Sequence, residues 1–339
     1  MAVRSLGRAP RSSRTMGWLG GVVLVVMVLG CLATLPYTLG KGDAVGSGRS
    51  LAAGTVSRRY EATNLDQALL PPFWSRHAPD ERQRAESSPQ PPRHLLGSDR
   101  LGRDLLTRCL AGGGISLGIG LAAAGIAVVI GTAYGALAGY LGGRIDGALM
   151  RIVDVVYGLP YILLVVLLAV AVDGLLERWG QDLSPGLRQA VNVVTLLVAI
   201  GGVSWLTLAR VIRGQVLTLK QQPFMEAARA VGVPLGRQFT RHLLPNLLGP
   251  IIVYATLTVP AAILSESFLS FLGIGVREPL PSWGNLAADG LSELNTVRVR
   301  WWLLVWPSLF IATTLLALNF VGEALREALD PKRRAVAVV

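Results

Sequence analysis

The sequence predicts an all-α, polytopic membrane protein with six transmembrane helices. Of its 339 residues, 52% are hydrophobic and only 16% are charged, whereas soluble globular domains carry about 25% charged residues. Six segments lack Asp, Glu, Lys and Arg over about the 20 residues that a helix needs to cross the hydrocarbon core. We expect these segments to be helices, because lipid offers no hydrogen-bond partners and a helix satisfies its backbone groups internally. These segments lie between Arg14 and Lys41, Arg108 and Arg144, Asp154 and Asp173, Arg188 and Arg210, Arg241 and Glu266, and Arg300 and Glu323.

The distribution of basic residues predicts the orientation in the membrane. With the N-terminus inside, sixteen arginines and lysines fall in cytoplasmic parts and five in the two short outer loops, as the positive-inside rule requires. The outer loop 38–110 carries eleven basic and eight acidic residues, but it is longer than the loops that the rule governs. We therefore expect a plasma (inner) membrane protein with cytoplasmic tails at 1–15 and 326–339.

The first predicted span, residues 16–37, has two interpretations. Arginines, a short apolar run and Cys31 resemble a signal peptide, including the lipoprotein type. The uncharged run continues through Tyr37, however, and a full span favours a retained anchor helix. Because cleavage would leave the remaining topology unchanged, charge counting does not separate the two.

The second stretch, which begins the five-span core 111–325, is unusually long. Its 35 uncharged residues would form a helix of about 52 Å at 1.5 Å per residue. We expect such a stretch to tilt, lie partly at the interface or break, and the run Gly112–Gly114 is the expected place for a break. Farther along, glycines at four-residue spacing predict a face that a second helix can approach closely. These are Gly131, Gly135, Gly139 and Gly143.

Residues 75–93 of the outer loop differ from the rest in composition. They are rich in Pro, Ser and charge and contain almost nothing to bury, which predicts a flexible or disordered insertion.

The loop between the fourth and fifth spans, residues 214–246, is predicted to contain a short helix. Pro223 suits the first helical turn, Glu226 lies in the positive N-terminal turn, and Gly232 suits the C-terminal cap. Together they predict a helix over Phe224–Val231.

Beyond this helix, Pro234 is expected to begin a second short helix, and Pro245 to mark the start of the fifth span. Ala227 and Ala228 present almost no side chain, so a partner surface could approach the backbone closely. A solvated surface loop is the alternative, although loops of this length are often functional.

These residues resemble a known family. The stretch from Glu226 to Asn246, EAARAVGVPLGRQFTRHLLPN, is similar to the EAA loop of ABC importer permeases. His242 gives the Arg-His-x-Leu-Pro-Asn form that is typical of peptide and nickel permeases. The positions of the family pattern are filled by Glu226, Ala227, Ala228, Gly232, Leu244 and Pro245.

Three further blocks resemble the same subfamily, in the same order along the chain. They are His94–Arg108 before the second span, Ser267–Gly290 after the fifth, and Trp301–Pro331 at the C-terminal end. The first block contains the extracytoplasmic motif Gly97, Asp99, Gly102, Arg103 and Asp104.

The resemblance implies a type I ABC importer permease fold and a non-catalytic transport subunit. It implies a homologous permease as heterodimer partner, two cytoplasmic ATPase subunits that bind ATP and Mg, and an extracytoplasmic substrate-binding protein. The EAA helix would insert into a cleft of one ATPase. Dipeptides, longer peptides, nickel chelates and other small solutes all remain open as substrates.

The residues themselves argue against several other classes of protein. None of the lysines Lys41, Lys220 and Lys332 stands in a G-x-x-x-x-G-K-[ST] motif, so no ATP site is expected in this chain. G-x-S-x-G occurs around Ser116, but it opens an apolar helix rather than a strand–turn–helix. Three histidines without H-E-x-x-H spacing predict no metal site. Sparse lysines among apolar stretches favour lipid over nucleic acid as the partner.

A self-sufficient secondary transporter or channel is the alternative function. Such a protein should show internal repeats with broken helices and ionisable groups inside the membrane. Neither is clear in the sequence, and the EAA loop would have no use there.

A few polar and aromatic residues near the outer ends of the spans need an interpretation. Glu266 is predicted to face the transport pathway, with a solvated position at the outer interface as the alternative. Asp99, Arg103 and Asp104 are expected to order an interfacial segment rather than to bind substrate. Trp283, Trp301 and Trp302 fit an aromatic belt.

Overall fold

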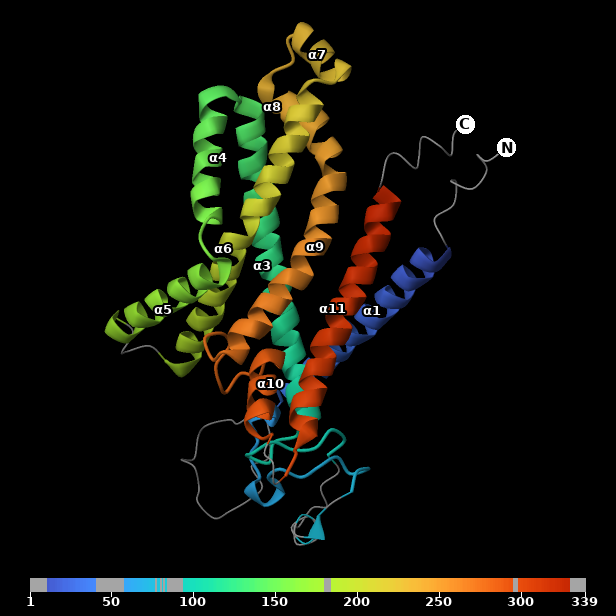
Figure 1. Ribbon diagram of the computed structural model, residues 1–339, viewed down its shortest axis with the longest axis vertical. Helices are drawn as coiled ribbons and strands as arrows, with labels where there is room; N and C mark the ends of the chain where they lie inside the picture. Colours follow the sequence, from blue (N-terminus) through green and yellow to red (C-terminus); the bar gives the residue numbers. More distant parts are fainter. Residues whose placement is uncertain are drawn as a thin grey trace.

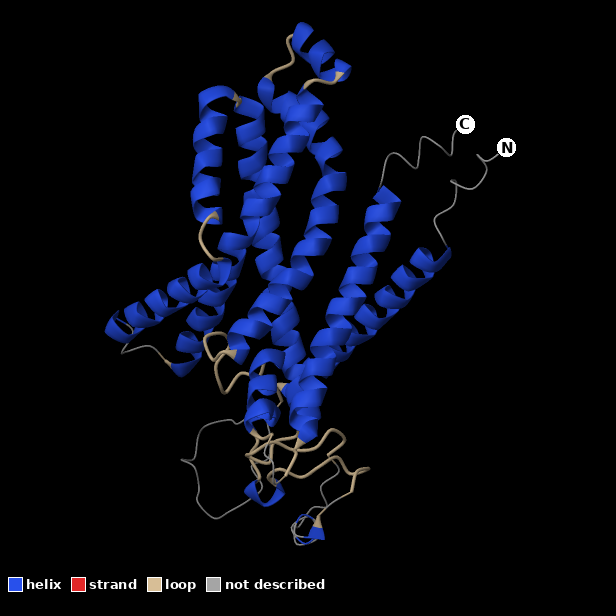
Figure 2. Cartoon of the chain, in the orientation of Figure 1, coloured by secondary structure: helices blue, strands red, loops and turns tan. Residues whose placement is uncertain are grey.

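The computed structural model describes residues 11–40, 58–76, 78–79, 81, 83, 94–179, 184–294 and 298–329. Within these residues the fold is a bundle of long helices (Figures 1 and 2). The insertion 75–93 and both predicted tails lie largely outside them. The elements are α1 (Arg11–Thr38), η1 (Arg59–Glu61), η2 (Leu65–Gln67), α3 (Leu105–Leu141), α4 (Gly143–Tyr157), α5 (Tyr161–Trp179), α6 (Pro185–Lys220), α7 (Pro223–Ala230), α8 (Leu235–Gln238), the π-helical turn η3 (Phe239–Leu243), α9 (Leu244–Phe271), α10 (Trp283–Ser292) and α11 (Trp301–Leu329).

Five stretches of helix in the described residues are long and apolar enough to cross a membrane, and a bent pair adds a sixth. The all-α, polytopic prediction is therefore confirmed. The sixth stretch combines α4 and α5, which meet at 85°. The first turn of α1 and the last turn of α11 point toward the end of the molecule that carries α7 (Figure 1). We call the opposite end, with α10 and residues 58–76 and 94–104, the distal end.

The prediction of a break at Gly112–Gly114 is wrong, because α3 runs unbroken for 37 residues. Two of these glycines are contact points rather than hinges. A Cβ on Gly112 would lie 3.2 Å from the backbone of Ser282, and one on Gly113 would lie 2.6 Å from the Sγ atom of Cys31. Close neighbours therefore surround the helix at the glycines where the sequence suggests a break.

The glycine face of α3 packs against α6, as predicted. Cβ atoms on Gly131 and Gly139 would lie 2.8 and 2.9 Å from carbonyl oxygens of α6, and one on Gly135 would overlap the carbonyl oxygen of Ala209. Gly143 is the exception: it begins α4 and has open space around it. Backbone-to-backbone contact thus joins α3 and α6 into one unit.

Gly135→Ala is expected to destabilise this unit by about 1–3 kcal/mol, because the added methyl group forces two backbones apart. Thermal unfolding of the detergent-purified protein measures the loss. Gly125→Ala is the matched control, since Gly125 lies on the same helix in open space and alanine favours a helix by about 1 kcal/mol over glycine. Equal effects at the two positions would contradict tight packing at Gly135.

Residues 143–157, which join the second and third predicted spans, form the helix α4 instead of a loop. Its acidic side chains bind arginines of α6: Asp146 accepts two hydrogen bonds from Arg213 at 2.5 and 2.6 Å, and Asp154 accepts one from Arg210 at 2.9 Å. These ion pairs, which link positions far apart in sequence, hold α4 beside the bundle.

Candidate functional site

The helix α7 projects beyond the ends of the long helices (Figure 1). It begins at Pro223, has Glu226 in its first turn and ends at Ala230, within one residue of the predicted bounds. Gly232 has a φ of +77°, a left-handed conformation that glycine adopts without strain. Its N–H donates to the carbonyl of Arg229 at 2.9 Å, which closes the helix end.

The surface that α7 presents includes Glu226 and Ala227, both exposed, as is Gly232 beyond the helix. Ala228, by contrast, is only 8% exposed. Its side chain therefore lies against the protein itself, and a role of Ala228 in coupling stays a prediction. The N–H of Val233 donates to the Ala228 carbonyl at 3.0 Å, so the chain folds back over that side of the helix.

After α7 a short loop, residues 231–234, leads the chain back to the bundle. Pro234 is the N-cap of α8, which confirms the second short helix, and α8 continues through η3 into α9. Pro245 lies in the first turn of α9 and is exposed, while Leu244 is half-buried. The fifth span therefore starts as a continuation of helix rather than at a new boundary.

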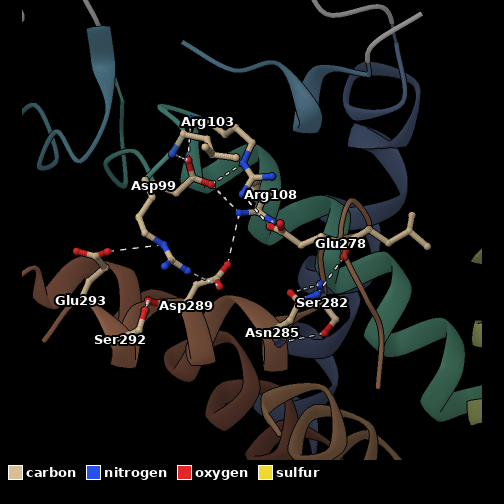
Figure 3. A network of polar contacts seen from close by, with 12 residues as sticks. Asp99, Arg103, Arg108, Glu278, Ser282, Asn285, Asp289, Ser292 and Glu293 are labelled. Atoms are coloured by element: carbon tan, nitrogen blue, oxygen red, sulfur yellow. Dashed lines mark hydrogen bonds and ion pairs between the residues drawn. The ribbon is translucent and has the colours of Figure 1, made fainter. Parts of the chain in front are cut away.

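A network of charged side chains, the distal network, lies at the other end (Figure 3). Asp99, Arg103 and Arg108 are buried, whereas the Glu278 side chain is 53% exposed. The Oδ2 atom of Asp99 accepts hydrogen bonds from Arg103 Nε and Arg108 Nη1, both at 2.6 Å. Glu278 Oε1 accepts from Arg103 Nη2 at 2.9 Å and Arg108 Nη2 at 3.1 Å. Two guanidinium groups thus neutralise two carboxylates, and Arg108 is fully buried.

Asp289 and Arg100 extend the distal network toward solvent, with an ion pair of 3.1 Å between them. Burial acts to raise the pKa of Glu278, but Arg103 and Arg108 outweigh it, so its pKa lies below the ordinary value. For Asp289 burial prevails and raises the pKa. A cavity of about 280 Å³ opens here, lined by Asp99, Arg100, Leu101, Arg103, Glu278, Asp289 and Leu303.

The residues of the predicted extracytoplasmic motif lie together at this point, where their hydrogen bonds connect residues 97–107; a role of the motif in transport stays a prediction. Gly102 has a φ of +70°, and a Cβ there would overlap the carbonyl oxygen of Asn64. Gly97 lies against Trp302, whose ring atoms would be 2.6 Å from a Cβ. Asp104 is the N-cap of α3 and accepts from the N–H of Thr107 at 2.8 Å.

Asp104→Ala is expected to cost about 1 kcal/mol of stability through loss of the N-cap. Burial acts to raise the pKa of Asp104, but hydrogen bonds from His94 and Thr107 outweigh it and lower the pKa. A carboxyl with a depressed folded pKa stabilises the fold above its unfolded pKa, and that contribution is lost as pH falls through the folded pKa.

Thermal unfolding of the purified protein from about pH 7 down to about pH 3 tests this expectation. The difference between wild type and Asp104→Ala should shrink with falling pH. A difference that stays constant over this range would show that the charge of Asp104 contributes nothing.

Glu266 lies on α9 and is fully buried within the chain, so the solvated alternative is wrong. Its Oε1 accepts from Ser270 Oγ at 2.8 Å and its Oε2 from Ser267 Oγ at 3.3 Å. Ser270 Oγ in turn accepts from the N–H of Val276 at 2.9 Å. The carboxyl therefore anchors the turn after α9; a role for Glu266 in the pathway stays a prediction.

The aromatic-belt interpretation is wrong for two of the three tryptophans. Trp283 and Trp302 are buried, and Trp283 Nε1 donates to the Cys109 carbonyl at 2.9 Å. Trp301 is half-buried and contacts Trp74 at a ring separation of 6.1 Å. The first two side chains fill the junction of α3, α10 and α11, which the sequence spacing does not reveal.

Sequence analysis missed Arg108, Glu278 and Asp289 as members of one site. Arg108 ends one of the blocks that resemble the family and Glu278 lies inside another, but 170 residues separate them. The available signal was the position of Arg108 at the edge of an uncharged stretch; Glu278 and Asp289 carry no such signal. Among the described residues, no three His, Cys, Asp or Glu side chains form a group that could hold a metal ion.

Comparison with known proteins identifies the family. Residues 131–335 match the binding-protein-dependent transport system inner membrane component family. The chain is 45% identical over 241 residues to the oligopeptide transport system permease protein OppC of Haemophilus influenzae, covering 71% of each chain. It is 44% identical over 268 residues to the dipeptide transport system permease protein DppC of Bacillus subtilis, covering 79% of this chain and 78% of the relative.

A third relative, the oligopeptide transport system permease protein OppC of Escherichia coli K12, is 46% identical over 269 residues, covering 78% of this chain and 82% of its own. These matches favour a non-catalytic transport subunit over a self-sufficient secondary transporter or channel. The chain belongs to the binding-protein-dependent transport system inner membrane components, as an ABC importer permease subunit of the dipeptide and oligopeptide transport family.

Proposed function

We propose that this permease forms, with a homologous permease subunit, the pathway by which peptides or similar small solutes enter the cell. Two cytoplasmic ATPase subunits, which bind ATP and Mg, drive the transport, and an extracytoplasmic binding protein delivers the substrate. The observation that carries this proposal is α7: a short helix held clear of the bundle, with Glu226 and Ala227 on its exposed surface.

The proposal places the α7 end in the cytoplasm and the distal end outside. The first turn of α1 and the last turn of α11 point to the α7 end (Figure 1), where the sequence concentrates its basic residues. A positive charge excess on short loops is typical of the cytoplasmic side. The names of the relatives favour peptides as the substrate class.

Reconstitution of the chain with its partner permease, ATPases and binding protein in lipid vesicles tests the proposal. Peptide-loaded binding protein should stimulate ATP hydrolysis, and labelled peptide should accumulate inside. A complex that assembles but neither hydrolyses ATP nor accumulates peptide would contradict it; nickel chelate in place of peptide distinguishes the substrate classes.

Glu266→Gln is expected to lower peptide uptake about tenfold. Both carboxyl oxygens of Glu266 accept hydrogen bonds from serine hydroxyls, and the NH2 group that replaces one oxygen cannot accept, so a buried polar group loses its partner at a cost of about 1–3 kcal/mol. The proposed consequence is a displaced turn after α9 at the mouth of the pathway. Uptake and substrate-stimulated ATPase activity in vesicles measure it. Glu323→Gln makes the same chemical change at an exposed position of α11 and serves as control; unchanged transport by Glu266→Gln would refute the role.

A further inference from the structure

A buried glutamine joins α7 to the long helices. Gln238, the last residue of α8, is only 3% exposed. Its Oε1 accepts a hydrogen bond from the hydroxyl of Tyr140 at 3.1 Å, and its Nε2 donates to the carbonyl of Val233 at 2.6 Å. One amide therefore links α3 to the turn that follows α7, and both of its ends are used.

The other side of α7 is fixed to the same turn of α3. Lys220 ends α6, just ahead of α7, and its Nζ donates to the carbonyls of Gly139 at 3.2 Å and Tyr140 at 2.8 Å. Arg229 Nη2 donates back to the Lys220 carbonyl at 3.3 Å. The segment from Lys220 to Gln238, which we call the arch, is thus hydrogen-bonded at both of its ends to the last turn of α3.

Apolar packing under the arch completes the attachment. Met225 of α7 is fully buried and packs in a cluster with Val216 of α6 and Ala136 of α3. The glycine face of α3 lies directly on the backbone of α6, so these two helices form one tightly packed unit. A force applied to α7 has two routes into that unit: the Met225 cluster, which is not directional, and the hydrogen bonds of Gln238 and Lys220, which are.

We propose that the Tyr140–Gln238–Val233 chain is the joint that converts displacement of α7 into movement of α3. Gln238 and Tyr140 are positioning residues, and the proposal rests on the proposed function of α7 as the site that couples to an ATPase. A buried amide suits this task, because each lost bond leaves a polar group without a partner, which makes the closed geometry strongly preferred.

Two substitutions test the joint in the complete reconstituted importer. Tyr140→Phe removes one oxygen atom and hence one hydrogen bond. Gln238→Met removes both amide bonds at similar side-chain volume. Each should lower the peptide transported per ATP hydrolysed by about threefold or more, the loss expected for one hydrogen bond, while ATP hydrolysis continues. The double variant should be no worse than Gln238→Met alone, because both substitutions break the same chain.

Tyr134→Phe is the matched control. Tyr134 lies on the same helix, and its hydroxyl donates to the Leu149 carbonyl of α4 at 2.8 Å rather than to the arch. Its ratio of transport to hydrolysis should equal that of wild type. A merely structural role would instead lower complex yield, hydrolysis and transport together.

The outcomes separate this inference from the proposed function. A wild-type complex without peptide-stimulated hydrolysis and uptake would refute the proposed function. If the wild-type complex transports peptide and the Tyr140→Phe and Gln238→Met complexes transport as much peptide per ATP hydrolysed as wild type, the joint alone is refuted. Equal loss in Tyr134→Phe, or failure of Tyr140→Phe to assemble, would also overturn it, because the bond would then serve folding.

Discussion

Replacing Arg108 by methionine is expected to give the largest loss of stability in the chain, about 3–5 kcal/mol, and to prevent assembly of the importer. Arg108 is fully buried, and its partner Asp99 is only 7% exposed. Without Arg108, Asp99 and Glu278 share the single guanidinium group of Arg103, so one of the two negative charges is left without a partner. Removing one partner of a buried ion pair costs this much because an uncompensated charge stays behind.

Yield of the detergent-purified complex, thermal unfolding and proteolysis of the distal segment measure the loss. Arg108→Lys should be intermediate, because one ammonium cannot reproduce two hydrogen bonds from a planar guanidinium. Arg100→Met is the matched control: Arg100 is 51% exposed, and surface ion pairs contribute about 0–1 kcal/mol. If the Arg108→Met protein were as stable as the Arg100→Met protein, the buried ion pairs of the distal network would not contribute the stability expected here.

Substitution in the α7 region is expected to separate ATP hydrolysis from transport. Gly232→Pro forces φ to about −65° where the structure requires +77°, and it removes the N–H that donates to Arg229. The end of α7 then loses its geometry, and uptake should fall more than about tenfold, since such a proline costs about 3 kcal/mol. Hydrolysis by the assembled complex should continue.

Glu226→Arg acts on the same site without the backbone change. The residue is exposed in the first turn of α7, where charge reversal costs the helix only about 0.3–1 kcal/mol. Glu226→Arg should therefore lower the peptide transported per ATP hydrolysed and leave the thermal stability of the protein nearly unchanged.

The matched control for both variants is Gly236→Ala, at an exposed helical glycine of α8 with open space around it. Uptake per ATP in assembled Gly232→Pro and Glu226→Arg complexes is compared with that in the control complex. Values equal to the control would show that α7 carries no coupling.

Features of this protein that depend on residues close together in the sequence could be predicted, whereas contacts between distant residues could not. The partition of an uncharged stretch between water and lipid depends on the stretch itself, so the polytopic class and five of the apolar helices followed from composition, whereas the 85° bend between α4 and α5 did not. The helix at Pro223 and its end at Gly232 depend on residues a few positions apart, and both were predicted. The spacing of Gly131, Gly135 and Gly139 predicted a packing face but not that α6 covers it.

The sequence by itself thus determined the membrane class, the spans, the α7 helix and, through its motifs, the family. Only the tertiary structure decided that α3 continues unbroken through Gly112 and Gly113, that Ala228 is buried, and that Arg108 forms an ion pair with Glu278. The first and third depend on residues far away in the chain, and the second on how the segment after α7 folds back. Burial and charge compensation at such contacts are set by packing in three dimensions. A local pattern of residues does not specify which distant side chain will pack against it.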